Sequence, residues 1–319
     1  TIREASLNGL TYVPSIENAC AQGTSGSGVT RTAIDLFGNN WSYEQANNII
    51  FMQYAKNNHV AGDPCVPRFT TKIDAGNVEK MAVDSKNNLW LISNKVIKIN
   101  LDWIYTDPLR QNLVVTIAGT NCKITDGVDE DTCHVFTNIP DGWDIAFDKD
   151  DSAWISQDKN DSQIIYQVPS AAAGDIDVVE HAIQGIREPR YLAVDVENNL
   201  WAVNNEFTCG AFAGCSAIAE GAATKSMVKI SLEKLTASKP VAFPASPTTI
   251  YGLAADTAGY IWVMTDKTAN VVHRFSAKDG AYIGPYIFAG GAGIVQRGNE
   301  SAIVSGMSAR IIKNYNDVS

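Results

Sequence analysis

The 319-residue sequence lacks several features that mark common functional classes. No apolar run approaches the roughly 20 residues that a membrane-spanning helix needs, so membrane insertion is not expected. Lys and Arg number 25 against 35 Asp and Glu, a formal charge of −10, and such an acidic chain repels nucleic-acid phosphates. Gly-x-Ser-x-Gly, His-Glu-x-x-His and glycine-rich phosphate loops are also absent. Nucleic acid is therefore not an expected partner, and the familiar catalytic signatures are missing.

Metal-binding cysteine patterns are missing too. The chain has only four histidines and no Cys-x-x-Cys pair, which argues against a structural zinc site. Its six cysteines form two tight local pairs and one remaining pair. This spacing predicts three disulfides, although six cysteines allow 15 connectivities. The predicted pairs are Cys20–Cys65, Cys122–Cys133 and Cys209–Cys215.

The cysteines also indicate a compartment. Disulfides persist where the environment is oxidising, so we expect a secreted protein, extracellular or periplasmic. Three Asn-x-Ser sequons fit secretion and are candidate glycosylation sites. They lie at Asn40, Asn160 and Asn299.

A five-fold internal repeat dominates the chain. The segments are "TAIDLFGNNW", "MAVDSKNNLW", "IAFDKDDSAW", "LAVDVENNLW" and "LAADTAGYIW". In each, Ala precedes Asp by two residues and Asp precedes Trp by six. The aspartates are Asp35, Asp84, Asp148, Asp195 and Asp256, and the tryptophans are Trp41, Trp90, Trp154, Trp201 and Trp262. Such recurrence makes the Asp a scaffold residue that caps a turn rather than a catalytic group.

Each repeat predicts a strand, a tight turn and a second strand. Apolar residues before the Asp favour a buried strand, and Asn or Gly in the turn tolerates positive φ. An apolar third strand follows each Trp strand, and a fourth follows that, with residues 112–119 expected as the fourth strand of the second unit. Four strands per unit, with tryptophans 47 to 64 residues apart, are typical of propeller blades.

We therefore predict an all-β, six-bladed propeller of four-stranded antiparallel blades. Residues 28–290 hold five recognisable blades. Residues 1–27 and 291–319 are expected to form the sixth blade together, so that both termini close one single domain and no sheet edge is exposed. The alternative is a chain truncated inside a larger propeller.

The blade core resembles known propeller families. The blade core is similar to that of the NHL-repeat, virginiamycin B lyase-like and SMP-30/gluconolactonase-like propellers. Its pattern is Pro-x-x-apolar-Ala-apolar-Asp-x-x-Gly/Asn-Asn-Leu-Trp, followed by a strand that reads apolar-apolar-Lys-Ile. The resemblance covers roughly residues 28–290 and rests on scaffold positions, so it indicates the superfamily and no particular member.

In such a blade, the entry to the inner strand and the loop after the Trp strand share one face. The Cys122–Cys133 and Cys209–Cys215 loops are both expected on that face, which favours it for recognition because binding residues often lie on loops held by a rigid scaffold. The alternative is that these disulfides only stabilise long surface loops and have no role in recognition.

Positions just before each repeat differ between blades. The position three residues before the Ala holds Thr30, Glu79, Trp143, Arg190 and Tyr251, and the next holds Arg31, Lys80, Asp144, Tyr191 and Gly252. Aromatic rings can stack on a sugar, and an Arg can pair with a carboxylate. The predicted ligand-binding residues are Glu79, Trp143, Asp144, Arg190, Tyr191 and Tyr251. Ordinary channel lining is the alternative.

The resemblance also implies enzymatic alternatives. A gluconolactonase-type site needs a divalent cation such as Ca²⁺ held by oxygen ligands, for which Glu79, Asp144, Asn205 and Asp266 are the candidates. The Pro-Asp-Gly at residues 140–142 is similar to that family's blade entry, but its Glu-Gly-Pro and Ser-Asn-Gly entries are missing. A virginiamycin B-type lyase needs a general base, and the candidate is His134 beside Cys133.

These observations favour a binding role over an enzymatic one. The expected function is a secreted recognition module for carbohydrate or an extracellular protein, with no cofactor required. A metal-assisted lyase or lactonase acting on an acidic sugar is the first alternative. A structural subunit of an extracellular assembly is the second.

Overall fold

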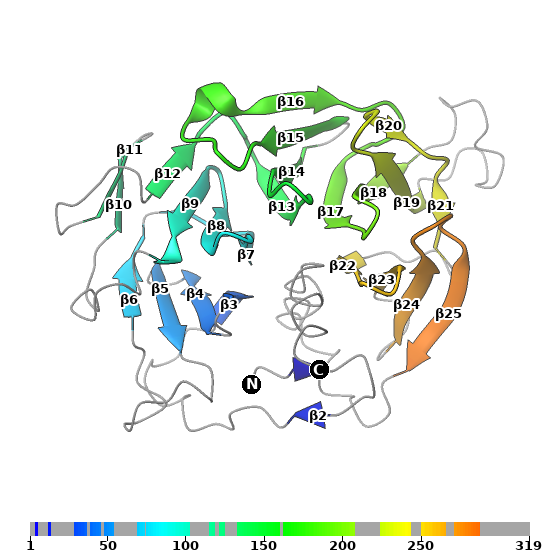
Figure 1. The fold of residues 1–319 in the computed structure, drawn as a ribbon, viewed down its shortest axis with the longest axis horizontal. Helices are drawn as coiled ribbons and strands as arrows, with labels where there is room; N and C mark the ends of the chain where they lie inside the picture. Colours follow the sequence, from blue (N-terminus) through cyan, green and yellow to red (C-terminus); the bar gives the residue numbers. More distant parts are fainter. Residues whose placement is uncertain are drawn as a thin grey trace.

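The computed structural model describes residues 4–5, 12–13, 29–36, 39–45, 48–53, 69–73, 75–102, 115–118, 121–124, 133–159, 162–207, 224–243, 250–265 and 271–287. This part of the chain is almost entirely β-structure. Five antiparallel sheets carry the five repeats, and we number them blades 1 to 5 in chain order. Figure 1 shows the five sheets placed around a common centre, with one strand of each nearest to it.

Each blade is built from strands in meander order. Blade 1 holds β3 (Val29–Ile34), β4 (Asn40–Glu44), β5 (Ile49–Gln53) and β6 (Phe69–Lys72). Blade 2 holds β7 (Lys80–Val83), β8 (Asn88–Ile92), β9 (Val96–Asn100) and β12 (Cys133–Phe136). Blade 3 holds β13 (Gly142–Phe147), β14 (Ala153–Gln157), β15 (Ile164–Val168) and β16 (Val179–Ala182), with the 3-10 helix η6 (Asp175–Asp177) before β16.

Blades 4 and 5 complete the set. Blade 4 holds β17 (Pro189–Val194), β18 (Asn199–Phe207), β19 (Thr224–Ser231) and β20 (Thr236–Ala237), and β21 (Val241–Ala242) also pairs with β19. Blade 5 holds β22 (Ile250–Ala255), β23 (Tyr260–Thr265), β24 (Val271–Ser276) and β25 (Tyr282–Ile287). The inner strands β3, β7, β13, β17 and β22 contact one another in that order. In the described residues, no helix is long and apolar enough to span a membrane.

The sixth blade remains a prediction. Two short strands near the amino terminus, β1 (Glu4–Ala5) and β2 (Tyr12–Val13), pair only with each other among the described strands. Residues 291–319 and the rest of 1–27 lie outside the described part of the chain. Closure of the ring by both termini is therefore still an expectation.

The predicted fourth strand of blade 2 is wrong. Within residues 112–119, the strand β10 (Val115–Ala118) pairs with β11 (Asn121–Ile124) in a hairpin that is separate from the blade. The outer strand of blade 2 is β12, which pairs with β9. Val135 and Phe136 of β12 are fully buried, and Phe136 stacks on Trp90 with ring centroids 6.0 Å apart. The apolar content of residues 112–119 was therefore not enough to predict the outer strand, because the burial of side chains against the blade decides which strand pairs with β9.

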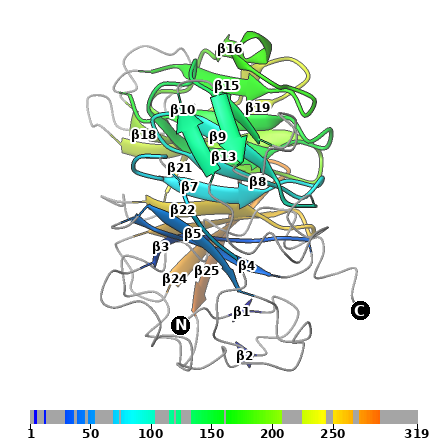
Figure 2. The same ribbon diagram turned by 90° about the vertical axis from the view of Figure 1, so that its left-hand side faces the viewer.

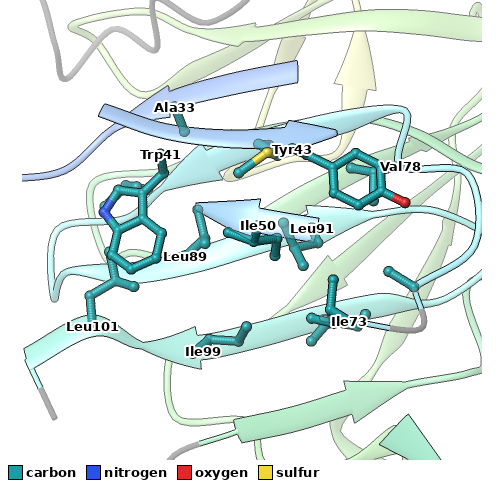
Figure 3. Close-up of a cluster of buried hydrophobic side chains, with 14 of the residues drawn as sticks. Ala33, Trp41, Tyr43, Ile50, Ile73, Val78, Leu89, Leu91, Ile99 and Leu101 are labelled. Carbon is teal, nitrogen blue, oxygen red and sulfur yellow. The ribbon is translucent and has the colours of Figure 1, made fainter. Parts of the chain in front are cut away.

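Apolar side chains fill the space between each pair of adjacent blades. Figure 3 shows the core between blades 1 and 2, where Trp41 and Ile50 of one sheet meet Leu89 and Ile99 of the other. Three further cores lie between blades 2 and 3, 3 and 4, and 4 and 5. Figure 2, turned by 90°, shows blade 1 in blue beside blade 2 in cyan. Hydrophobic burial thus joins the sheets face to face.

The motif Asp and Trp bond to each other in every blade. Oδ2 of the Asp accepts a hydrogen bond from the indole Nε1 at 2.7 to 2.9 Å in all five repeats. Oδ1 accepts turn amides, as in Asp84, which is bonded by Lys86 N and Asn88 N at 2.9 Å. The predicted turn-capping role of the Asp is confirmed. The hydrogen bond to the indole was not predicted, and it explains why the spacing between Asp and Trp is always six residues.

A second bond joins the turns of neighbouring blades. The residue three positions after the motif Asp has positive φ: Asn87 (60°), Asp151 (62°) and Asn198 (63°). Its side chain accepts a hydrogen bond from the preceding blade, where the donor is the backbone N–H of the residue after the motif Asp. The pairs are Leu36 N with Asn87 Oδ1 at 3.2 Å, Ser85 N with Asp151 Oδ1 at 3.2 Å, and Lys149 N with Asn198 Oδ1 at 2.8 Å. Blade 5 has Gly259 at this position, with φ +84° and open space where a Cβ would lie, and a glycine has no side-chain acceptor to offer to Val196.

We expect Asp84→Asn to destabilise the protein by about 2 kcal/mol. An Asn presents an N–H toward either the indole or the turn amides, so a donor must face a donor. Urea denaturation measures the loss, with Asp150→Asn as the matched control because Asp150 is exposed and its side chain bonds that of Lys149. Equal stability of the two variants would contradict the assigned role.

We expect Gly259→Asn to stabilise the protein. Asn tolerates positive φ and can supply the missing acceptor, which predicts a gain of about 1 kcal/mol and a melting temperature about 2 °C higher. Gly259→Ala is the control, because Ala adds a side chain without an acceptor. The explanation fails if the Ala variant is as stable as the Asn variant in thermal unfolding.

Candidate functional site

The starts of the inner strands lie at one end of the blades, together with the loops after the Trp strands. Three backbone bonds join these segments: Glu79 N to Ile92 O at 2.7 Å, Asp158 N to Asp141 O at 2.8 Å and Asn205 N to Glu188 O at 3.1 Å. We call this end the entry face. The Asp turns lie at the opposite end of the same strands, as the repeat predicts.

Three ion pairs link neighbouring blades at the entry face, and one of them, between Arg190 and Asp158, is described with the Trp143 cluster below. Arg31 of blade 1 contacts Glu79 of blade 2, with 3.0 Å between Nη2 and Oε2, and its Nε donates to the Glu79 backbone carbonyl. Lys80 of blade 2 contacts Asp144 of blade 3, with 3.0 Å between Nζ and Oδ1. Two predicted ligand-binding residues, Glu79 and Asp144, are therefore each paired with a cation of the preceding blade that was not predicted as a ligand-binding residue.

Asp144 is a deeply buried charged group of this face. Its side chain is 2% exposed, and its carboxylate accepts the N–H of Leu192 at 3.0 Å and that of its neighbour Ile145 at 2.9 Å. Burial raises the pKa of Asp144, and the Lys80 ammonium partly offsets that effect. Asp144 thus connects blades 2, 3 and 4 through one carboxylate.

Trp143, Arg190 and Tyr191 form a cluster beside it. The Arg190 guanidinium lies 4.9 Å from the Trp143 ring centroid, and the Tyr191 ring meets Trp143 edge-on at 6.5 Å. Arg190 also contacts Asp158 at 2.7 Å and Glu188 at 3.2 Å. Burial, followed by the nearby Asp144 charge, raises the pKa of Tyr191 to about 12, which keeps the phenol protonated at neutral pH.

A pocket of about 300 Å³ opens between blades 2 and 3 on this face. Polar residues form most of its lining, together with Gly142 and the ring of Trp143. The residues are Asn77, Glu79, Ser93, Asn94, Asp141, Gly142, Trp143 and Asp158. Gly142 brings the blades together here, because a Cβ at this position would lie 2.8 Å from Cγ2 of Ile92 and 3.4 Å from the Ser93 carbonyl.

The structure brings together five of the six predicted ligand-binding residues. Glu79 and Trp143 line the pocket, and Asp144, Arg190 and Tyr191 lie next to them through the contacts above. The side chain of Tyr251 lies outside the described residues. The sequence pattern missed Asn77, Asn94, Asp141 and Asp158, since they belong to turns outside the repeat; the Asp141 in Pro-Asp-Gly was the only one with a recognisable local motif.

The metal candidates do not meet as a group within the described residues. Glu79 and Asp144 each contact a cation, and Asn205 bonds Glu188 Oε1 at 2.7 Å and accepts from Lys225. No three His, Cys, Asp or Glu residues of the described part lie close enough to hold a metal ion. Asp266 lies outside it, so the four-residue site stays a prediction.

The Cys122–Cys133 disulfide is present, with 5.6 Å between the Cα atoms, but its expected position is wrong. Cys133 belongs to β12 and pairs with Ile99, next to the Asp-turn end of blade 2, where Leu101 N bonds Asn87 O. The disulfide therefore lies away from the entry face. His134 follows it on the outer strand opposite Lys98, so this candidate base is not placed at the pocket.

The remaining modification sites stay predictions. Cys20–Cys65 and Cys209–Cys215 lie outside the described residues, as do Asn160 and Asn299. Asn40 begins β4, but its side chain is not among those described.

Comparison with known proteins establishes the fold. No family model matches the sequence, and no curated protein matches it. Among solved structures, a catalytically inactive virginiamycin B lyase from Staphylococcus aureus with quinupristin is similar at a TM-score of 0.51 and 14% identity, over 85% of this chain and 73% of that one. The Dos1 propeller gives 0.52 and 8% over 90% and 62%, and a chain of a nidogen/laminin complex gives 0.50 and 9% over 82% and 80%. The chain is a β-propeller.

We expect Lys80→Met to destabilise the protein by about 3–5 kcal/mol at neutral pH, because it leaves the buried Asp144 charge unpaired. Burial already raises the pKa of Asp144 above its usual 3.8. A raised folded-state pKa gives stability that is present below the unfolded pKa and is lost as pH rises through the folded pKa. The variant raises the pKa of Asp144 further. The difference in folding stability between Lys80→Met and wild type should therefore become smaller as the pH falls.

Urea denaturation at pH 7 and at about pH 4.5 tests whether the stability loss of Lys80→Met becomes smaller at the lower pH. Lys80→Met combined with Asp144→Asn is the control, since it removes the buried charge and should recover stability at pH 7. A loss in Lys80→Met that is equal at both pH values would contradict the assignment.

Proposed function

We propose that this propeller is a binding module that recognises carbohydrate through the entry-face pocket between blades 2 and 3. The pocket itself carries the proposal. It combines the indole of Trp143 with the amides of Asn77 and Asn94 and the hydroxyl of Ser93. Sugars present apolar ring faces and many hydroxyls, so an aromatic ring among hydrogen-bonding side chains suits them.

The size of the pocket favours a sugar over a protein surface. A volume of about 300 Å³ lies at the small end of the range for small-molecule sites. The indole is also held in a fixed orientation, because Arg190 contacts its face and Tyr191 its edge. A preorganised ring loses less freedom on binding than a mobile one.

The chemistry of the face supports binding more than catalysis. A general base works best when its pKa lies near the operating pH and its proton-accepting atom is free. Three acid–base groups of this face do not meet these conditions, because Lys80 pairs with the Asp144 carboxylate, Arg31 pairs with Glu79, and the Tyr191 phenol has a pKa of about 12. The similar fold of virginiamycin B lyase keeps a metal-assisted lyase or lactonase as the alternative, and the test below includes turnover.

Secretion belongs to the same proposal. The Cys122–Cys133 disulfide supports an oxidising compartment. An extracellular binding module would meet carbohydrate on cell surfaces or in matrix material.

We expect Trp143→Ala to weaken carbohydrate binding by about tenfold or more. Wild type and variant are compared on a glycan array, and the best ligand is then measured by calorimetry. Asn94→Ala should weaken binding as well, and because the Asn94 side chain is exposed this variant tests the pocket even if Trp143→Ala folds poorly. Tyr282→Ala is the control, an exposed aromatic on the outer strand of blade 5.

The same ligands are screened for new unsaturated sugar ends. Binding without turnover, weakened by both pocket variants, is the expected result. Turnover would establish the lyase alternative. An array on which the wild-type protein binds nothing would refute the carbohydrate proposal.

A further inference from the structure

We infer that the pocket selects an amino sugar, with Asp141 as the counter-ion of its protonated amine. This inference rests on the proposed function, since it names the class of carbohydrate that the same pocket takes. It follows from how charge is distributed among the residues that form the pocket.

The pocket lining carries acids but no base. Glu79, Asp141 and Asp158 line it, while no Lys or Arg among the described residues does. Two of these carboxylates have a cation behind them: Arg31 lies 3.0 Å from Glu79, and Arg190 lies 2.7 Å from Asp158. Their charges are compensated by the protein itself.

Asp141 differs from the other two. Asp141 is an exposed residue that lines the pocket, and within the described part of the chain its carboxylate has neither an ion pair nor a hydrogen bond. One uncompensated negative charge therefore remains on the pocket wall. A ligand with one positive charge at this place would balance it.

The backbone holds Asp141 in a defined position. Its φ is +52°, a region that Asp and Asn enter more readily than most residues. Its carbonyl accepts the N–H of Asp158 at 2.8 Å, and Gly142 next to it packs against Ile92 where a Cβ would not fit. These contacts fix the backbone of Asp141 where this residue lines the pocket.

An amine fits this arrangement better than a metal ion. Ca²⁺ requires six to eight oxygen ligands, whereas two of the three carboxylates here are engaged by arginines. An ammonium needs acceptors for only three N–H groups. The Asp141 carboxylate and the amide oxygen of Asn94 line the same pocket and can supply them.

Three oligosaccharides of equal length test the inference, because they differ only at carbon 2 of each sugar. Chitosan oligomers carry an ammonium there, chitin oligomers an acetamide and cello-oligomers a hydroxyl. Calorimetry at low salt and mildly acidic pH measures each affinity. We expect the wild-type protein to bind the chitosan oligomer about tenfold more tightly than the other two.

Asp141→Asn should remove this preference, so that the variant binds the three oligomers with equal affinity. Asn tolerates the positive φ, so the variant keeps the local backbone. Asp150→Asn is the matched control: it removes the same charge from the same blade, in the turn between β13 and β14 at the opposite end. This control should retain the full preference.

The outcomes separate the two proposals. Equal binding of the three oligomers by the wild-type protein, or an unchanged preference in Asp141→Asn, overturns the amine inference and leaves carbohydrate binding intact. Binding of other glycans on the array but of none of these oligomers also overturns it. A wholly blank array refutes the proposed function itself.

Discussion

The hydrogen bond between the motif Asp and the motif Trp is the interaction on which the rest of the molecule depends. It recurs in all five described blades at 2.7 to 2.9 Å. One carboxylate closes the turn with one oxygen and fixes the indole with the other. The fixed indole then lies in the core between adjacent sheets, as Trp41 does in Figure 3. Local turn chemistry and the packing between blades are thus set by the same residue pair.

Cations add to this arrangement on the third strand. Lys98 lies 5.4 Å from the Trp90 ring centroid, and Lys229 lies 5.8 Å from that of Trp201. Lys229 also contacts the Asp195 carboxylate at 3.5 Å, so a buried acid, an indole and an ammonium support one another. In blade 3, His181 of the outer strand β16 stacks on Trp154, with ring centroids 5.2 Å apart, so this histidine supports the motif tryptophan.

The sequence predicts the blades well because their determinants are local. The six-residue spacing from Asp195 to Trp201 is visible in the chain, and so are the turn and strands around it. The outer strand of blade 2 was not predictable in this way, because β12 follows a long connection and is selected by the burial of Val135 and Phe136. The same error placed Cys133 and His134 on the wrong face.

The candidate site was predictable only in part, for a related reason. Glu79 and Trp143 stand at fixed offsets from the repeat, so their meeting could be foreseen. Asp158 and Asn94 belong to hairpin turns without a shared pattern, and their place in the pocket depends on how blades 2 and 3 approach at Gly142. Contacts between blades are long-range facts that a local pattern does not contain.

The separation of the two ends of each blade has a consequence for mutational tolerance. The hydrogen bonds between the motif Asp and Trp lie at the Asp turns, whereas the residues that line the pocket lie at the entry face, at the other end of the same strands. Substitutions at Asp141 or Asn94 therefore leave the turn bonds untouched, and substitutions in the turns leave the pocket lining untouched. Ligand preferences can therefore change at pocket residues outside the ion pairs without a matching loss of folding stability, whereas substitutions of Lys80 or Asp144 would change both.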